Sequence, residues 1–234
     1  MKLLVRFCNL KFINKIFGFL VNTRFSKIFI PAFRRHYKIN TQEILPGQKF
    51  KSLNDYFARA IDMDYRPMGA GKYISPCDGV ITAGGNISPG MTFEVKGKMV
   101  DVPTLLNRQA DVKAFQVIYL SPHNYHRFHA IDDNEATGMY ELGDKSIPVN
   151  DLGFEMGNPF LDNYRVILET EDYFYIAIGA TNVNSVKFFK GKFKKGECIG
   201  EFRFGSTIVI LYKEDIKGLK LGEIEVREDL GESS

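Results

Sequence analysis

The chain carries a serine in a setting that could support nucleophilic chemistry. Ser206 follows Gly205 inside the run EFRFGSTIVILY, and glycine weakens the interior of a strand. A serine hydroxyl is a weak nucleophile unless a neighbouring base takes its proton. The Gly-Ser pair therefore indicates either a β-bulge or a reactive peptide bond, and the choice depends on whether a base is available.

Histidines are the first candidates for that base. Three of the four fall within seven residues, at His123, His126 and His129. On a helix this spacing would suggest a metal site, but no cysteine or clustered carboxylate completes a ligand set. If the chain instead re-enters a strand at Arg127, His126 and His129 face opposite sides. Each histidine alone is explained more simply as structural, while three so close together make catalysis an equal alternative.

Asp78 supplies the acid that a serine–histidine pair would need. It precedes a glycine in SPCDGVI, where an Asp-Gly turn that opens a hairpin is the simpler explanation in isolation. With a histidine and Ser206 it could form an Asp–His–Ser arrangement, in which the acid orients the imidazole and the imidazole deprotonates the hydroxyl. The chain has no G-x-S-x-G elbow, which argues against a hydrolase of that kind.

The elements that would position these residues are mainly short strands. From Lys72 onward, β-branched and aromatic runs alternate with Gly, Pro, Asn and Asp, which predicts an antiparallel β-sandwich or barrel. Two stretches with Gly-punctuated tight turns, SPCDGVITAGG and GKFKKGECIGEFRFG, are typical of biotinyl/lipoyl-like folds. The expected fold class is α+β, mainly antiparallel β.

Helices are expected before the strands. Residues 1–40 are predicted to be helical, as two short helices broken near Gly18 and ending around residues 34–37. Residues 52–61 form a second candidate, with Ser52 or Asn54 available as the N-cap.

The first 42 residues differ in charge from the rest of the chain. They contain nine Lys or Arg, seven Phe and no Asp or Glu, although the net charge of the whole chain is only +3. Basic and aromatic residues together suit the surface of an anionic membrane. No uncharged run approaches the ~20 residues of a spanning helix, and charges interrupt any signal-peptide core. We expect residues 1–45 to be a helical membrane-association segment and residues 46–234 to be the catalytic domain.

Two other uses of the basic segment compete with membrane association. A helical interaction surface remains an alternative, whereas no RNA motif or recognition helix favours nucleic-acid binding. The three cysteines are far apart and form no C-x-x-C pair, so we interpret them as free thiols in a reducing compartment.

Three motifs, taken together, resemble the phosphatidylserine decarboxylase proenzymes. SPCDGVI, YLSPHNYHRFHA and KKGECIGEFRFGSTIVILY stand in that family's order and approximate spacing. LNDYFARAI followed by Arg66-Pro67, and the stretch IGATNVNSVKF, agree with it. The resemblance covers residues 50–213. Over the N-terminal segment only the general character is similar, a basic helical region that associates with membranes.

The resemblance implies that the Gly-Ser bond is cleaved by the chain itself. Ser206 would attack the carbonyl of Gly205 and convert the amide to an ester, with His129 as the base. Asp78 would orient that base. Elimination at the serine and hydrolysis of the resulting dehydroalanine would then leave a pyruvoyl group in place of Ser206.

The pyruvoyl cofactor derived from Ser206 would accept electrons as CO2 leaves phosphatidylserine, which gives phosphatidylethanolamine. His126 is the candidate acid or base that reprotonates the carbanion. The products of cleavage would be a β chain of residues 1–205 and an α chain of residues 206–234 that stay associated. The implied protein is a homodimer, bound peripherally to an anionic membrane at the cytoplasmic face of the cell membrane.

The chain departs from the family's pattern in two places. Ala130-Ile131 stands where a proline usually follows the second motif histidine, and Tyr164 stands where an acid is usual. His123 occupies a position that is more often another polar residue and is given no role. Two alternatives stay open: a pyruvoyl-dependent decarboxylase of a soluble amino acid, and a non-catalytic lipoyl-like module.

Overall fold

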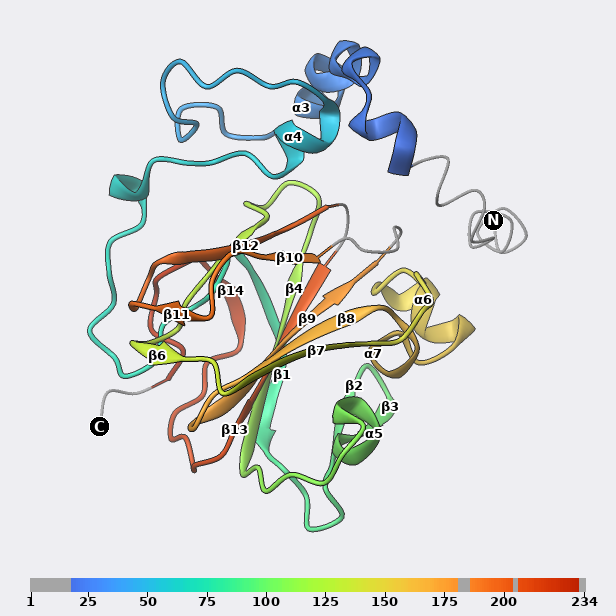
Figure 1. The fold of residues 1–234 in the computed structure, drawn as a ribbon, viewed down its shortest axis with the longest axis vertical. Coiled ribbons are helices and arrows are strands. Elements are labelled where there is room, and N and C mark those ends of the chain that lie inside the picture. The colour runs from blue at the N-terminus through green and yellow to red at the C-terminus, as the bar shows by residue number, and fades with distance from the viewer. Residues whose placement is uncertain (1–17, 181–185, 204–205, 232–234) are drawn as a thin grey trace.

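The chain folds around one large antiparallel sheet (Figure 1). The computed structural model describes residues 18–180, 186–203 and 206–231. In spatial order the sheet contains β14 (Gly222–Ile224), β1 (Gly79–Asn86), β4 (Ala114–Leu120), β13 (Ser206–Tyr212), β9 (Tyr173–Gly179), β8 (Arg165–Glu169) and β7 (Gly138–Leu142). Three smaller sheets lie beside it: β10 (Val186–Phe188), β12 (Cys198–Phe202) and β5 (Arg127–His129); β11 (Lys192–Phe193) and β6 (Asn134–Glu135); β2 (Thr92–Val95) and β3 (Lys98–Asp101).

Both faces of the large sheet are covered, which explains the continuous apolar runs of its central strands. Successive side chains of β13 alternate between two hydrophobic clusters. Ile208 and Ile210 pack with Phe128 of β5 and Phe202 of β12 on one face. On the opposite face Val209 and its neighbours pack with β2, β3 and the short helices α5 (Val102–Leu106), α6 (Asp151–Met156) and α7 (Pro159–Asp162).

The predicted fold class is confirmed in its main part. The structure is α+β, and every pair of neighbouring strands in the four sheets is antiparallel. The barrel alternative is wrong for the described strands, because β14 and β7 end the large sheet without pairing to each other. The apolar runs are buried because other elements cover both faces of an open sheet. The lipoyl-like features stay a prediction.

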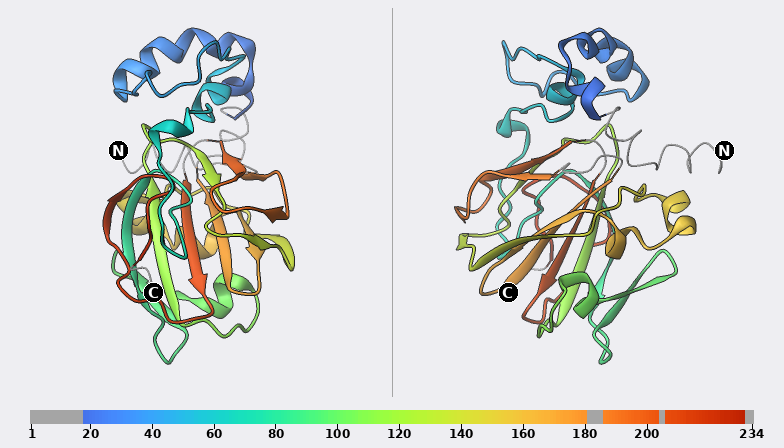
Figure 2. Two further views of the ribbon diagram at one scale, coloured as in Figure 1. Left: turned by 90° about the vertical axis from the view of Figure 1, so that its left-hand side faces the viewer. Right: turned by 45° about the vertical axis from the view of Figure 1, so that its right-hand side comes forward.

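The N-terminal part forms a helical cap at one end of the sheets (Figures 1 and 2). It contains a helical stretch at residues 18–22, η1 (Arg24–Phe29), α3 (Ile30–His36), α4 (Leu53–Phe57) and, farther along the chain, η2 (Met63–Tyr65). The predicted end of the helical region near residues 34–37 is confirmed by the end of α3. The prediction for residues 1–17 lies outside the described residues. Within the described part of the chain, no helix is long and apolar enough to cross a membrane.

Hydrogen bonds fix α4 to η1 within the cap. The Ser52 hydroxyl accepts a hydrogen bond from the Asp55 amide at 3.1 Å, which confirms the predicted N-cap. The Ser26 hydroxyl of η1 accepts from the Leu53 amide at 2.8 Å. The first turn of α4 is therefore held by its own cap and by η1.

Candidate functional site

Strand pairing brings Ser206 and Asp78 to the same end of the large sheet. Ser206 begins β13, where it pairs with Leu120 at the end of β4 and with Gly179 at the end of β9. Asp78 directly precedes β1, which pairs with the other side of β4. The two residues are thus two strands apart at one sheet end, although the sequence separates them widely.

Ser206 is a fully buried serine with an unused hydroxyl. Among the described residues its Oγ atom has no hydrogen-bond partner. From Ser206 to Tyr212, β13 keeps unbroken register with both neighbours, so the described strand contains no bulge. Side chains alternate along a strand, so Ser206 shares the face of Ile208, which β5 and β12 cover. Gly205 lies outside the described residues.

His129 lies in β5 and is 2% exposed. Its Nδ1 atom lies 2.9 Å from the Gly196 carbonyl oxygen, which can only accept, so Nδ1 carries the proton. The Nε2 lone pair then accepts a hydrogen bond of 3.0 Å from the Tyr125 hydroxyl. His129 is therefore held in the tautomer that a base at Nε2 requires.

His126 is also buried, directly before β5, and its second ring nitrogen is unused. Nδ1 lies 2.9 Å from the Asn124 carbonyl oxygen and must donate to it. Nε2 is buried without a hydrogen-bond partner among the described residues. The ring packs on Phe57 of α4 with 3.8 Å between centroids. The predicted strand after His126 is confirmed, and His123 is exposed.

Burial keeps both imidazoles neutral. It lowers the pKa of His126 to about 3, against a smaller raising effect of the bond to Asn124. It lowers the pKa of His129 to about 4, with the bond to Gly196 opposing it. A neutral imidazole with a lone pair on Nε2 is the form that can take a proton from a nucleophile.

These two pKa values predict that acid destabilises the fold. A histidine in the unfolded chain titrates near pH 6.5. Below that pH the unfolded chain therefore binds protons that the buried histidines of the folded chain do not bind. At pH 5 each histidine should lower the free energy of unfolding by about 2 kcal/mol relative to pH 8. Urea unfolding of the Ser206→Ala chain, which lacks the hydroxyl predicted to attack Gly205, measures this. His126→Gln should remove about half of the effect, and the exposed His36→Gln none. An equal loss of stability in all three chains would contradict the prediction.

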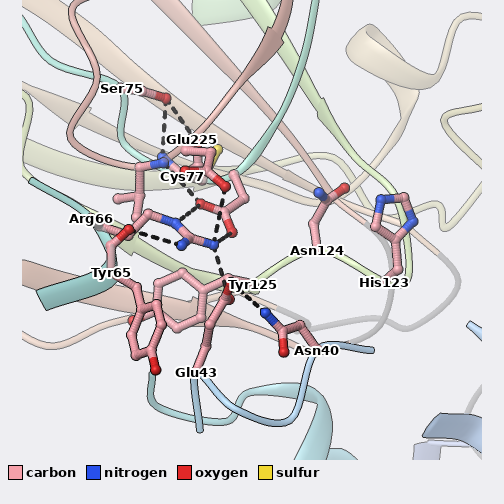
Figure 3. Close-up of polar contacts among 12 residues, drawn as sticks. Asn40, Glu43, Tyr65, Arg66, Ser75, Cys77, His123, Asn124, Tyr125 and Glu225 are labelled. Atoms are coloured by element: carbon pink, nitrogen blue, oxygen red, sulfur yellow. Dashed lines mark hydrogen bonds and ion pairs between the residues drawn. The ribbon is translucent and has the colours of Figure 1, made fainter. Parts of the chain in front are cut away.

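Asp78 belongs to an ion cluster centred on the buried Arg66, which Figure 3 shows beside Glu43 and Glu225. Arg66 donates to both of its carboxylate oxygens, from Nε to Oδ1 at 3.1 Å and from Nη2 to Oδ2 at 2.9 Å. The Val226 amide donates to Oδ1 at 2.8 Å. The same Nη2 of Arg66 reaches Glu43 at 3.0 Å and Glu225 at 3.5 Å. Burial lowers the pKa of Arg66, but the hydrogen bonds and charges of Asp78 and Glu43 raise it by more.

The predicted pairing of Asp78 with His129 stays a prediction. The side-chain hydrogen bonds described for Asp78 go to Arg66 and Val226, and those described for His129 go to Tyr125 and Gly196. Sequence reasoning gave no role to Arg66 or Tyr125. The available signals were the Arg66-Pro67 pair in one supporting motif and the place of Tyr125 beside His126.

A pocket of about 410 Å³ opens next to Asp78. Besides Asp78 it is lined by Gly79, Val80, His123, Asn124, Glu223, Ile224, Glu225 and Glu228. Among the described residues no group of His, Cys, Asp or Glu is arranged to hold a metal ion. Cys77 and Cys198 are free thiols, as expected, and Cys8 lies outside the described residues.

The two departures from the family's pattern are both buried. Tyr164 belongs to the hydrophobic core, and burial together with Glu141 raises its pKa to about 12. Ala130 and Ile131 are fully buried in the same core. At these positions, where the resemblance led us to expect a proline and an acid, the chain has core residues.

The family model described as phosphatidylserine decarboxylase matches residues 53–231. The chain belongs to the phosphatidylserine decarboxylase family. Curated phosphatidylserine decarboxylase proenzymes resemble it over nearly their whole length. One from Bacillus cereus is 34% identical over 241 residues, which cover 95% of this chain and 92% of that protein. One from Bacillus mycoides is 33% identical over 230 residues, which cover 92% and 88%.

Membership of the decarboxylase family confirms the resemblance given by the sequence motifs. The match also extends past residue 213 and includes Val226, whose amide binds Asp78. It begins at Leu53, the first residue of α4, so η1 and α3 lie outside the matched region.

Proposed function

We propose that this chain is a self-processing, pyruvoyl-dependent decarboxylase that converts phosphatidylserine to phosphatidylethanolamine and CO2. The observation that carries the proposal is the hydroxyl of Ser206, buried without a partner among the described residues and directly after Gly205 in the sequence. A buried polar group without a hydrogen bond costs roughly 1–3 kcal/mol. A reacting nucleophile accounts for that cost, whereas a core position would favour alanine.

The proposed processing uses the residues at this sheet end. Ser206 Oγ attacks the carbonyl carbon of Gly205 while His129 takes the hydroxyl proton and returns it to the departing amine, which gives an ester. For this, Tyr125 must release Nε2 of His129. Loss of a proton from Cα of Ser206 then expels Gly205 as a carboxylate. Water hydrolyses the remaining dehydroalanine, releases ammonia and leaves the pyruvoyl group.

The residues present fit a pyruvoyl group at position 206. The buried start of β13 gives it a fixed place, and the unpartnered Oγ marks the atom at which it would form. Such a group supplies an electron sink for the loss of CO2. His126, whose Nε2 lone pair is unused among the described residues, is the proposed residue for proton transfer at the reacting carbon.

The proposed α chain would remain bound after cleavage. Its first strand, β13, lies between β4 and β9 of the proposed β chain and pairs with both over its full length. Its later strand β14 pairs with β1. Cleavage before Ser206 therefore leaves three ladders and a buried core to hold the chains together.

The denatured mass of the purified protein tests this proposal. Processing yields two pieces that separate after Gly205, and the smaller one carries a ketone that reacts with hydrazides. A single chain of 26.7 kDa that stays intact on prolonged incubation would exclude self-processing.

We further propose that the helical cap docks on an anionic membrane at the cytoplasmic face. Five large apolar side chains of residues 18–29 are exposed and are called the apolar patch: Phe19, Leu20, Phe25, Ile28 and Phe29. The exposed basic side chains of Arg24 and Lys27 lie on η1 with part of the patch, and those of Arg34 and Arg35 lie on α3, which follows directly. Apolar side chains with cations beside them suit the boundary between acyl chains and anionic headgroups. A soluble substrate would give no reason to expose this patch.

Vesicle binding tests the docking surface. Phe25 and Ile28 are 84% and 73% exposed, so Phe25→Ser with Ile28→Ser should leave the fold intact. Each side chain contributes roughly 1.5–3 kcal/mol on burial, so affinity for phosphatidylserine-containing vesicles should fall by at least about 100-fold. Leu221→Ser, at a site 64% exposed and remote in sequence, is the matched control. Unchanged affinity in the double variant would contradict docking by the patch, and no binding by the unaltered chain would favour a soluble amine substrate.

A further inference from the structure

The helical cap faces the turn between β4 and β5 (Figure 1). Several buried polar side-chain atoms of these two parts have no hydrogen-bond partner among the described residues. Tyr56 of α4 has a buried hydroxyl without a hydrogen-bond partner among the described residues. In Arg59, just after α4, both Nε and Nη1 are buried without a hydrogen-bond partner among the described residues. In His126 the Nε2 atom is likewise buried without a described hydrogen-bond partner. Buried polar groups are normally paired, and exceptions are expected where a ligand or ion supplies the partner.

Contacts place these atoms in one neighbourhood. Nη2 of Arg59 donates to the carbonyl oxygens of His123 at 3.0 Å and Asn124 at 3.2 Å. The same Asn124 oxygen accepts from Nδ1 of His126 at 2.9 Å. The Arg59 guanidinium lies 5.8 Å from the centre of the Tyr56 ring. One backbone carbonyl therefore joins the Arg59 cation to the imidazole proposed for proton transfer.

The charge of Arg59 lacks a direct counter-ion in the described structure. Its side chain is only 4% exposed, and none of the described ion pairs includes it. Asp78 and Glu43 act on it at longer range, but both bind Arg66 directly. Burial accordingly lowers the pKa of Arg59. A buried charge without a paired partner is strongly unfavourable, so an anion from outside the chain would stabilise it.

We propose that Arg59 and Tyr56 form a binding site for the phosphodiester of the phospholipid headgroup. This inference rests on the proposed function. Nε and Nη1 of Arg59 each carry an N–H without a described acceptor, on opposite edges of the guanidinium, so one of them can donate to a phosphate oxygen. The Tyr56 hydroxyl is a second donor. Nε2 of His126 is an acceptor and suits an N–H group of the same zwitterionic headgroup.

The chemistry of decarboxylation favours the phosphate over the carboxylate as the anion bound by Arg59. A guanidinium on the carboxylate would stabilise the ground state and oppose the loss of CO2. Binding a remote phosphate instead contributes affinity without holding back the group that leaves. Arg59 is thus a specificity residue for phosphate-bearing substrates.

The test uses the full chain with Ser206→Ala, so that binding is measured without the pyruvoyl group. Glycerophosphoserine and inorganic phosphate should each bind and raise the melting temperature, while L-serine should not. A stronger effect of glycerophosphoserine than of phosphate would identify the headgroup, rather than free phosphate, as the ligand. Arg59→Gln should weaken glycerophosphoserine binding by at least about tenfold, because it removes a charge-assisted pair. Arg59→Lys should recover part of the loss, and Tyr56→Phe should cause a smaller one.

The matched control is Arg108→Gln, which removes a half-exposed arginine paired with Glu169 at the surface. It should leave glycerophosphoserine binding unchanged. Equal binding by the Arg59→Gln and Arg108→Gln chains would overturn the proposal, as would equal binding of L-serine and glycerophosphoserine. A lower melting temperature of Arg59→Gln with unchanged affinity would also overturn it and would assign Arg59 to holding the turn at residues 121–126. Binding is measured on the uncleaved Ser206→Ala chain, so its result does not depend on processing. Failure of the unaltered chain to cleave would therefore refute the processing proposal and not the binding site.

Discussion

Ser206→Ala is expected to give one intact chain of 26.7 kDa under denaturing conditions, where the unaltered protein gives two pieces. The substitution removes only Oγ, the atom proposed to attack Gly205. Because Oγ has no hydrogen-bond partner among the described residues, its loss leaves no other described group unsatisfied. The melting temperature should therefore stay the same or rise while cleavage and hydrazide reactivity disappear. Mass spectrometry of denatured protein and thermal unfolding measure the two effects.

Thr207→Val is the matched control for this variant. Thr207 is the next residue of β13, and its hydroxyl is also buried without a described partner. Its side chain faces the opposite side of the sheet, because side chains alternate along a strand. Valine has nearly the same shape, so cleavage after Gly205 should continue. If Thr207→Val stopped cleavage as completely as Ser206→Ala, the hydroxyl of Ser206 would have no special role.

The strands were predictable because their residue types suit a pleated sheet that is buried. The run from Ser206 to Tyr212 is apolar and β-branched, and it forms the central strand β13. The order of strands was not predictable. β13 pairs with β4 and β9, which lie far earlier in the chain, and no local pattern records which distant strands become neighbours. The same long-range pairing decides that the sheet ends in two open edges.

The candidate residues could be named from the sequence, whereas their contacts could not. Asp78, His126, His129 and Ser206 were named from motifs and all four are buried, and their roles stay predictions. Arg66 and Val226, the partners of Asp78, lie outside those motifs. The partners of the two histidines lie within them, but the motifs do not show which of their residues meet. A tautomer depends on a tertiary contact such as that of His129 with Gly196, which the sequence does not indicate.

Arg66→Gln is expected to slow cleavage after Gly205 on the order of 100-fold, because Arg66 positions Asp78. Arg66 donates hydrogen bonds to both carboxylate oxygens of Asp78 and is itself buried. Without the cation, Asp78 keeps a buried charge that has lost its partner, which costs about 3–5 kcal/mol. A carboxylate that shifts to find a new partner misplaces the proposed processing machinery, and small misplacements have effects of about this size. The rate of appearance of the two pieces measures the change.

Arg66→Lys separates positioning from simple loss of stability. Lysine keeps the charge but loses the planar fork that binds two oxygens at once, so cleavage should recover in part. Glu43→Gln removes a different partner of the same Nη2 atom and leaves the contacts of Asp78 in place, so it should cleave almost normally. If Arg66→Gln cleaved at the normal rate, Asp78 would not depend on Arg66. If Glu43→Gln were as slow as Arg66→Gln, the helical cap would be part of the machinery, because Glu43 belongs to the segment between α3 and α4.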